Sequence, residues 1–193
     1  DEASLSAAVA GAELVVIGEV HDNPDHHAIQ ARLVRAVGAT QRRTALAFEM
    51  LEEDEQPKVD AALERAPGDP DAIARAVDWE HGGWYAFSIY RPIFSAGLDA
   101  GMRIVAANLP VRVAKDIAFQ GKAALPAYVE AALDRAGLAP EAIASWREEM
   151  KSSHCDAPMP EEILDRLVLA QRARDAQMAL RMIGGVASGA VLI

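Results

Sequence analysis

Four short apolar segments constrain the fold of this chain more than any other feature of its sequence. Short, continuous apolar runs are typical of parallel strands that are covered on both faces of a sheet. The residues between the runs have helical periodicity. The pattern therefore predicts an α/β fold with a mainly parallel sheet and flanking helices. The four predicted strands are 13–19 (ELVVIGE), 44–50 (TALAFEM), 102–108 (MRIVAAN) and 190–193 (AVLI).

The segment after the first predicted strand carries the clearest signals of a helix. In 24–38 (PDHHAIQARLVRAVG), Asn23 is the expected N-cap, Pro24 occupies the first helical position and Gly38 ends the helix. A strand, a helix and a second strand form a βαβ unit, which is right-handed in nearly all proteins. Residues 52–80 are charged and predict short helices after the second strand.

Residues 110–183 predict a large helical insertion before the last strand, because they contain no convincing strand pattern. With 193 residues, of which 51% are hydrophobic, the chain can build one core, so we expect a single α/β domain over 1–193. One cysteine excludes an internal disulfide. A terminal strand normally leads into a loop that shapes a site, so we expect the natural protein to continue beyond Ile193.

The charge of the chain excludes nucleic acid as an expected partner. The net charge is −10, and no basic face is available for phosphate contacts. The sequence contains no P-loop, Rossmann glycine signature or G-x-S-x-G motif, so we expect no nucleotide cofactor.

Polar side chains stand at the ends of three predicted strands. Glu19 and His21 follow the first, Glu49 ends the second and Asn108 ends the third. Ligands of open α/β sheets bind beyond the carboxyl ends of the strands, so these residues predict a pocket with catalytic potential. A local role is the alternative: Glu19 would cap the following turn and His21 would pack against a helix. For Glu49 alone, the local role is the better explanation.

Residues of the helical insertion are candidates for closing this pocket. They are His154 in the loop SSHC and the residues Gln171, Arg174 and Asp175, which share one face of a helix. A solvated helix face is the alternative for the last three. A catalytic thiol at Cys155 is disfavoured, because adjacent side chains on an extended loop point apart.

Two neighbouring histidines, His26 and His27, fall in the first turn of the predicted helix 24–38. Their spacing from His21 matches no metal motif of known geometry, so we expect two solvated side chains. A metal held by His21, Glu19 and Glu49 is conceivable, but spacing alone does not support it.

The segment 79–92 (WEHGGWYAFSIYRP) concentrates aromatic residues, including two of the three tryptophans and two of the three tyrosines. Because Gly82 and Gly83 interrupt it, we expect a loop or a broken helix rather than a core element. Aromatic side chains on an irregular segment often form a ligand or partner surface. A local apolar core is the alternative.

Several segments together resemble the ChaN-type haem-binding uptake family, which belongs to a wider group with the Tiki, TraB and erythromycin-esterase proteins. The segments occur in the family's order, and they are VVIGEVHDNPDHH, AFEM, YRPIFSAGLDAGMRIVAANLP, SHC and AQRARDAQMA. The resemblance implies an iron-regulated lipoprotein of Gram-negative bacteria that serves haem or iron uptake. Such a protein would be periplasmic or associated with the outer membrane through a lipid anchor that this chain lacks.

The resemblance also implies a homodimer that encloses two cofacial haems. A tyrosine of one monomer would ligate each iron, and a histidine and a lysine of its partner would hold the propionates. Tyrosinate is a hard anionic donor that favours ferric iron. Tyr90 lies in a matching segment and is the first candidate for the iron ligand, and Tyr85 is the second. His81 is the candidate for a propionate contact, with Lys58 or Lys115 as basic partners.

The relatives with esterase or metallopeptidase activity imply an alternative function as a hydrolase. Glu19 or Glu49 would then act as general base on a water molecule, and His21 would orient it or bind a metal. The sequence departs from the family in one respect. A second G-x-x-H motif is expected after a late strand, and the sequence ends at Ile193, where that motif would begin.

Overall fold

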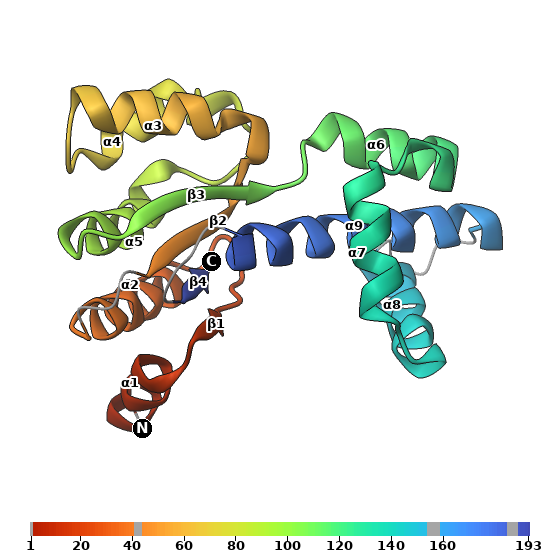
Figure 1. The fold of residues 1–193 in the computed structure, drawn as a ribbon, viewed down its shortest axis with the longest axis horizontal. Helices are drawn as coiled ribbons and strands as arrows, with labels where there is room; N and C mark the ends of the chain where they lie inside the picture. The colour runs from red at the N-terminus through yellow and green to blue at the C-terminus, as the bar shows by residue number, and fades with distance from the viewer. Residues whose placement is uncertain (1, 41–43, 154–158, 185–188) are drawn as a thin grey trace. The chain divides into compact units, whose positions relative to one another are not determined.

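The computed structural model describes residues 2–40, 44–153, 159–184 and 189–193 (Figure 1). The chain divides into two compact units. The first contains the residues up to Asn108 together with Arg181–Ile193, and the second contains Leu109–Leu180. The second unit corresponds to the predicted helical insertion, which confirms that a helical segment precedes the last strand.

A parallel sheet forms the centre of the first unit, as the apolar segments predicted. Its strand order is β1-β4-β2-β3, and each pair of neighbours is parallel. The C-terminal strand therefore lies inside the sheet, where Val191 pairs with Val15 on one side and Leu46 on the other. The strands are β1 (Leu14–Val16), β2 (Ala45–Glu52), β3 (Arg103–Asn108) and β4 (Ala190–Leu192).

Helix α2 (Pro24–Gly38) has the bounds that its end signals predict. The Asn23 side chain accepts a hydrogen bond from the backbone N–H of Asp25 at 3.0 Å, as an N-cap residue does. Helix α2 packs against α5 (Phe87–Asp99) and against α1 (Glu2–Gly11). Helix α1 was not predicted, because its small residues form no amphipathic stripe.

Two short helices follow β2, as the charged residues 52–80 predicted. They are α3 (Gln56–Arg65) and α4 (Pro70–Ala76), which pack together, and α3 also contacts β3 (Figure 1). The 3-10 turn η1 (Glu53–Glu55) connects β2 to α3, and η2 (Trp79–His81) follows α4.

The core of the first unit lies between β2 and α5. Phe48 of β2 stacks on Phe94 of α5 with ring centroids 3.8 Å apart. Gly97 permits this close approach, since a Cβ atom there would lie 2.4 Å from Cδ2 of Leu46.

The aromatic segment 79–92 contributes directly to this core, because Trp79 and Tyr90 are buried within it. The segment is a broken helix, which is one of the two predicted forms, because η2 and the start of α5 flank an irregular stretch. Residues 82–86 of this stretch form no helix or strand. The expectation that the segment contributes no core residue is wrong for Trp79 and Tyr90.

The described residues of the second unit form helices joined by short connections, and they contain no strand. The unit contains α6 (Val111–Gln120), the 3-10 turn η3 (Gly121–Ala124), α7 (Ala127–Ala136), α8 (Pro140–Ser153) and most of α9 (Glu161–Gly184). Its small core includes Ile117 of α6, Val129 of α7 and Ala173 of α9. Within the described part of the chain, no helix is long and apolar enough to span a membrane.

Candidate functional site

A buried polar cluster lies where the chain leaves β1. We call it the Glu19 cluster, and it consists of Glu19, His21, His27 and Tyr90. The Glu19 side chain is only 5% exposed. Its Oε1 atom accepts a hydrogen bond from the Tyr90 hydroxyl at 3.0 Å and lies 2.9 Å from Nδ1 of His21. A carboxylate this far from solvent requires such partners, because unpaired burial of a charge is costly.

His27 is the member of the cluster that sequence reasoning missed. Its side chain is 1% exposed, its ring lies 4.3 Å from the Tyr90 ring and its Nε2 lies 3.6 Å from Oε2 of Glu19. The expectation of two solvated histidines is therefore wrong for His27. Its spacing from Gln30, Ala31 and Val34 on the buried stripe of α2 could have revealed this burial.

Burial and negative charge keep the Tyr90 phenol protonated. Burial is the largest cause of its raised pKa, and the charge of Glu19, the hydrogen bond to Glu19 and the charge of Glu49 raise the pKa further. The side chain is also fully buried. An iron ligand must be an accessible tyrosinate, so this arrangement counts against Tyr90 in that role.

Glu49 and Asn108, which end the second and third predicted strands, are joined by a hydrogen bond from a side chain to a backbone carbonyl. The Asn108 side chain is buried, and its Nδ2 donates a hydrogen bond to the carbonyl oxygen of Glu49 at 2.8 Å. Glu49 lies near enough to Tyr90 for its charge to affect the Tyr90 pKa. Among the described residues, no group of three or more His, Cys, Asp or Glu side chains is arranged to hold a metal. The structure therefore gives no support to a metal at these strand ends.

His21 connects the Glu19 cluster to the surface. Its side chain is 44% exposed, and its ring packs edge-on against Trp84 with centroids 5.2 Å apart. Since Nδ1 faces the Glu19 carboxylate, Nε2 is the nitrogen left to bind a proton or a ligand. A carboxylate that orients an imidazole in this way is a recurring element of acid–base sites.

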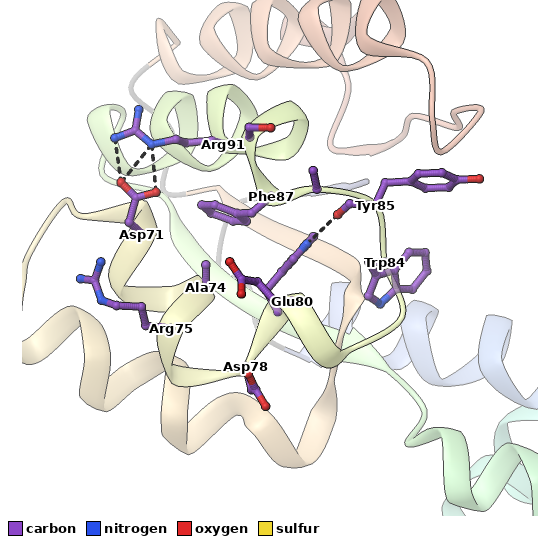
Figure 2. Close-up of a pocket in the computed structure, with 12 residues that line it drawn as sticks. Asp71, Ala74, Arg75, Asp78, Glu80, Trp84, Tyr85, Phe87 and Arg91 are labelled. Atoms are coloured by element: carbon purple, nitrogen blue, oxygen red, sulfur yellow. Dashed lines mark hydrogen bonds and ion pairs between the residues drawn. The ribbon is translucent and has the colours of Figure 1, made fainter.

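A pocket of about 790 Å³ lies between α4, η2 and the start of α5 (Figure 2). We call it the aromatic pocket. Its volume falls within the range of small-molecule sites. The lining residues are Asp71, Ala74, Arg75, Asp78, Trp79, Glu80, Trp84, Tyr85, Ala86, Phe87, Ser88 and Arg91.

The two ends of the aromatic pocket differ. At one end, Trp79 donates a hydrogen bond from Nε1 to the carbonyl of Tyr85 at 2.9 Å, which fixes the loop that carries Trp84 and Tyr85. Tyr85 is 51% exposed, and Figure 2 shows its phenol pointing away from the arginines. At the other end, Arg91 holds Asp71 through hydrogen bonds of 2.9–3.0 Å. The bond to Arg91 lowers the pKa of Asp71.

Two of the predicted propionate contacts lie at the surface in pairs with carboxylates. His81 lies 2.8 Å from Asp78, which raises its pKa, and it is 79% exposed. Lys58 lies 3.5 Å from Glu55. Their predicted roles with haem stay predictions.

The predicted residues of the helical insertion lie in the second unit. On α9, Gln171 donates a hydrogen bond to Asp175 at 2.9 Å and accepts one from Arg174 at 3.3 Å. Gln171 and Asp175 also line a pocket of about 280 Å³ beside Trp146 and Met150. His154 and Cys155 lie outside the described residues. That these side chains close the strand-end pocket stays a prediction.

The parallel sheet with its flanking helices defines an α/β protein, and the polar cluster and the pocket are its candidate sites for a ligand. Over residues 5–193 the chain matches the model of the family described as haem-binding uptake, Tiki superfamily, ChaN. The chain therefore belongs to this family, as the sequence motifs indicated.

A solved structure, described as cofacial haem binding to ChaN of Campylobacter jejuni, has the same fold. It matches with a TM-score of 0.78 and 22% sequence identity, and the match covers 98% of this chain and 72% of that chain. At this identity the likeness shows the fold alone. No curated protein matches the chain.

Proposed function

We propose that this protein binds haem and serves haem uptake. The family supports the proposal, and so does the shared fold with ChaN of Campylobacter jejuni, which is described as binding haem cofacially. The observation in the structure that carries it is an exposed tyrosine beside a half-buried tryptophan. Tyr85 and Trp84 stand together on the rim of a pocket that is large enough for a ligand.

Tyr85 is the iron ligand in this proposal. The chain has three tyrosines, of which Tyr85 is 51% and Tyr128 is 46% exposed, whereas Tyr90 is fully buried. Tyr128 belongs to α7 and lines none of the pockets described above. Tyr85 therefore combines an accessible hydroxyl with a neighbouring indole on which a porphyrin face can pack. Ferric iron is the state that a phenolate oxygen favours.

Binding at such a site leaves one face of the porphyrin in water. A second copy of the chain would cover that face and remove its apolar surface from solvent, so the haem-bound state is a homodimer in this proposal. A periplasmic location with a lipid anchor to the outer membrane fits the family resemblance and is part of the same proposal.

The test is a titration of the purified protein with ferric haem, followed by absorbance and by the size of the product. We expect a shifted Soret band, a phenolate-to-iron charge-transfer band and a species of twice the monomer mass. Tyr85→Phe should lose the charge-transfer band, whereas the matched variants Tyr90→Phe and Tyr128→Phe should keep it. Absence of a Soret shift contradicts haem binding. Retention of the band in all three variants places the ligand on another residue.

The Glu19–His21 contact favours a second candidate function, hydrolysis. In this second proposal the roles differ from those expected: the buried Glu19 would orient the imidazole, and His21 would present Nε2 as the general base. In a screen of ester substrates, His21→Gln should abolish turnover. His81→Gln is the matched control, because His81 is also an exposed histidine beside a carboxylate. Absence of turnover across the screen, or equal turnover in both variants, contradicts this function.

A further inference from the structure

The charges that line the aromatic pocket are paired with one exception. Arg91 is held by Asp71, Arg75 donates to Asp69 at 2.9 Å, and Asp78 lies 2.8 Å from His81. Glu80 forms no hydrogen bond or ion pair with any residue in the described ranges. The pocket is left with one carboxylate whose hydrogen-bonding capacity is not used by any residue that the structure describes.

Glu80 is an exposed residue, and the wall of the pocket that its carboxylate faces is aromatic and apolar. Figure 2 shows its carboxylate pointing into the pocket, toward Ala74 and Phe87. Phe87 packs edge-on against the buried Trp79 with ring centroids 5.1 Å apart, and both residues line the pocket. Aromatic faces attract cations through their quadrupole, and a carboxylate accepts hydrogen bonds from them. The aromatic rings and the carboxylate therefore both favour a cationic ligand that can donate hydrogen bonds.

We propose that the Glu80 end of the aromatic pocket binds an organic cation, an ammonium group carried on a flat apolar body. The ammonium would lie against the Glu80 carboxylate, and the apolar body would lie on the half-buried Phe87, which the buried Trp79 supports from the core side. The chain's net charge of −10 adds a long-range attraction for cations. This site is separate from the haem proposal, because Figure 2 shows Tyr85 pointing away from this end of the pocket.

The two arginines of the pocket define the competing ligand class, a carboxylate. A carboxylate ligand would have to displace Asp69 from Arg75 or Asp71 from Arg91, and the second of these pairs is held by three hydrogen bonds. A cation displaces no partner of Glu80. The structure therefore favours the cation.

Three probes of nearly the same shape separate these classes: 2-phenylethylammonium, 2-phenylethanol and 3-phenylpropanoate. Binding is measured by tryptophan fluorescence and by ligand-observed NMR on the full chain. For ligands of this size at a half-open site we expect a Kd of about 1 mM for the ammonium and weaker binding of the other two.

Variants that replace one charged side chain by a neutral one of similar size then test which residue binds the ammonium. Glu80→Gln should weaken the ammonium about fivefold or more. Asp78→Asn removes the same charge from the same pocket, but its carboxylate is engaged by His81 and points away from the interior in Figure 2. Asp78→Asn, Arg75→Gln and Tyr85→Phe should each change the ammonium affinity less than twofold. Thermal unfolding of each variant confirms that the fold is kept.

Tighter binding of the carboxylate probe, with its loss in Arg75→Gln, would overturn the proposal in favour of an anion site. Equal affinity of Glu80→Gln and the unchanged protein, or no binding of the ammonium, would overturn it as well. Haem titration is a separate readout, so the failure of either proposal leaves the other to be judged by its own measurement.

Discussion

Two tyrosines that are five positions apart belong to regions of opposite character. Tyr90 is fully buried in the Glu19 cluster, where its hydroxyl donates to Glu19 at 3.0 Å. Tyr85 stands half-exposed on the rim of the aromatic pocket, and its backbone carbonyl, not its hydroxyl, is held by Trp79. The start of α5 at Phe87 separates them. The comparison shows that the contacts of a tyrosine's hydroxyl limit its role. They indicate a role in stability for Tyr90, and they are the reason that we propose Tyr85 as the ligand-binding residue.

The largest expected difference between the two regions is in the free energy of unfolding when each tyrosine is replaced by alanine. Tyr90→Ala removes a fully buried ring and should lower the free energy of unfolding by about 3–5 kcal/mol. Tyr85→Ala should change it by less than about 0.5 kcal/mol, because its side chain is half in solvent. Urea unfolding followed by circular dichroism measures both. Similar losses in the two variants would remove the distinction between the regions.

The acceptor of the Tyr90 hydrogen bond gives a second, smaller effect. Glu19→Ala removes the nearer acceptor of the buried Tyr90 hydroxyl and leaves it only the longer bond to the carbonyl oxygen of His21 at 3.3 Å, which should cost about 1–3 kcal/mol. Glu80→Ala is the matched control in the aromatic pocket and should cost less than about 0.5 kcal/mol, since Glu80 bonds to no described residue. A cost for Glu80→Ala equal to that of Glu19→Ala would show that the aromatic pocket also depends on internal bonds.

High pH sharpens the comparison further. The folded-state pKa of Tyr90 is raised above 10.0, the ordinary value for tyrosine. A raised pKa contributes stability that is present below the unfolded value and is lost as pH rises above it. Unfolding free energies above pH 10 should therefore fall more steeply in the unchanged protein than in Tyr90→Phe. Parallel slopes in the two proteins would contradict the assigned burial of the phenol.

The smallest expected effect lies at the rim of the aromatic pocket. The hydrogen bond and the charge of Asp78 raise the pKa of His81 above 6.5. This pair stabilises the fold below pH 6.5, and its contribution disappears as pH rises through the folded pKa of His81. Because both side chains are exposed, screening by solvent keeps the contribution small. An NMR titration should show the raised pKa, and Asp78→Asn should return it to its ordinary range. An unchanged pKa in that variant would contradict the pairing.

The sequence predicted the strands of the sheet well, because a short apolar run is a local signal that needs no information from distant residues. The segments TALAFEM, MRIVAAN and AVLI are mainly apolar and form buried strands, as predicted. The prediction of burial on both faces is wrong for β1, an edge strand of three residues in which Leu14 and Val16 are exposed. The bounds of α2 were predictable for the same reason. Asn23 and Pro24 mark the start of the helix and Gly38 marks its end, and each does so through local backbone geometry.

The candidate site was less predictable, because its contacts join distant parts of the chain. Glu19 and Tyr90 are 71 positions apart, and no local pattern states that they meet. The sequence does not reveal which tyrosine of the segment 79–92 faces the core, since that depends on where α5 begins. Tyr90 is the first candidate from the sequence because it lies in a matching segment, and its burial is the reason that we propose Tyr85 in its place.

The central claim is that Tyr85, and not Tyr90, presents the phenolate to haem iron. Resonance Raman spectroscopy of the ferric haem complex tests it most directly, with excitation in the phenolate-to-iron charge-transfer band, because only a coordinated phenolate is then enhanced. We predict phenolate ring modes in the unchanged protein and in Tyr90→Phe, and their loss in Tyr85→Phe. Persistence of these modes in Tyr85→Phe, or their loss in a folded Tyr90→Phe variant, would contradict the claim.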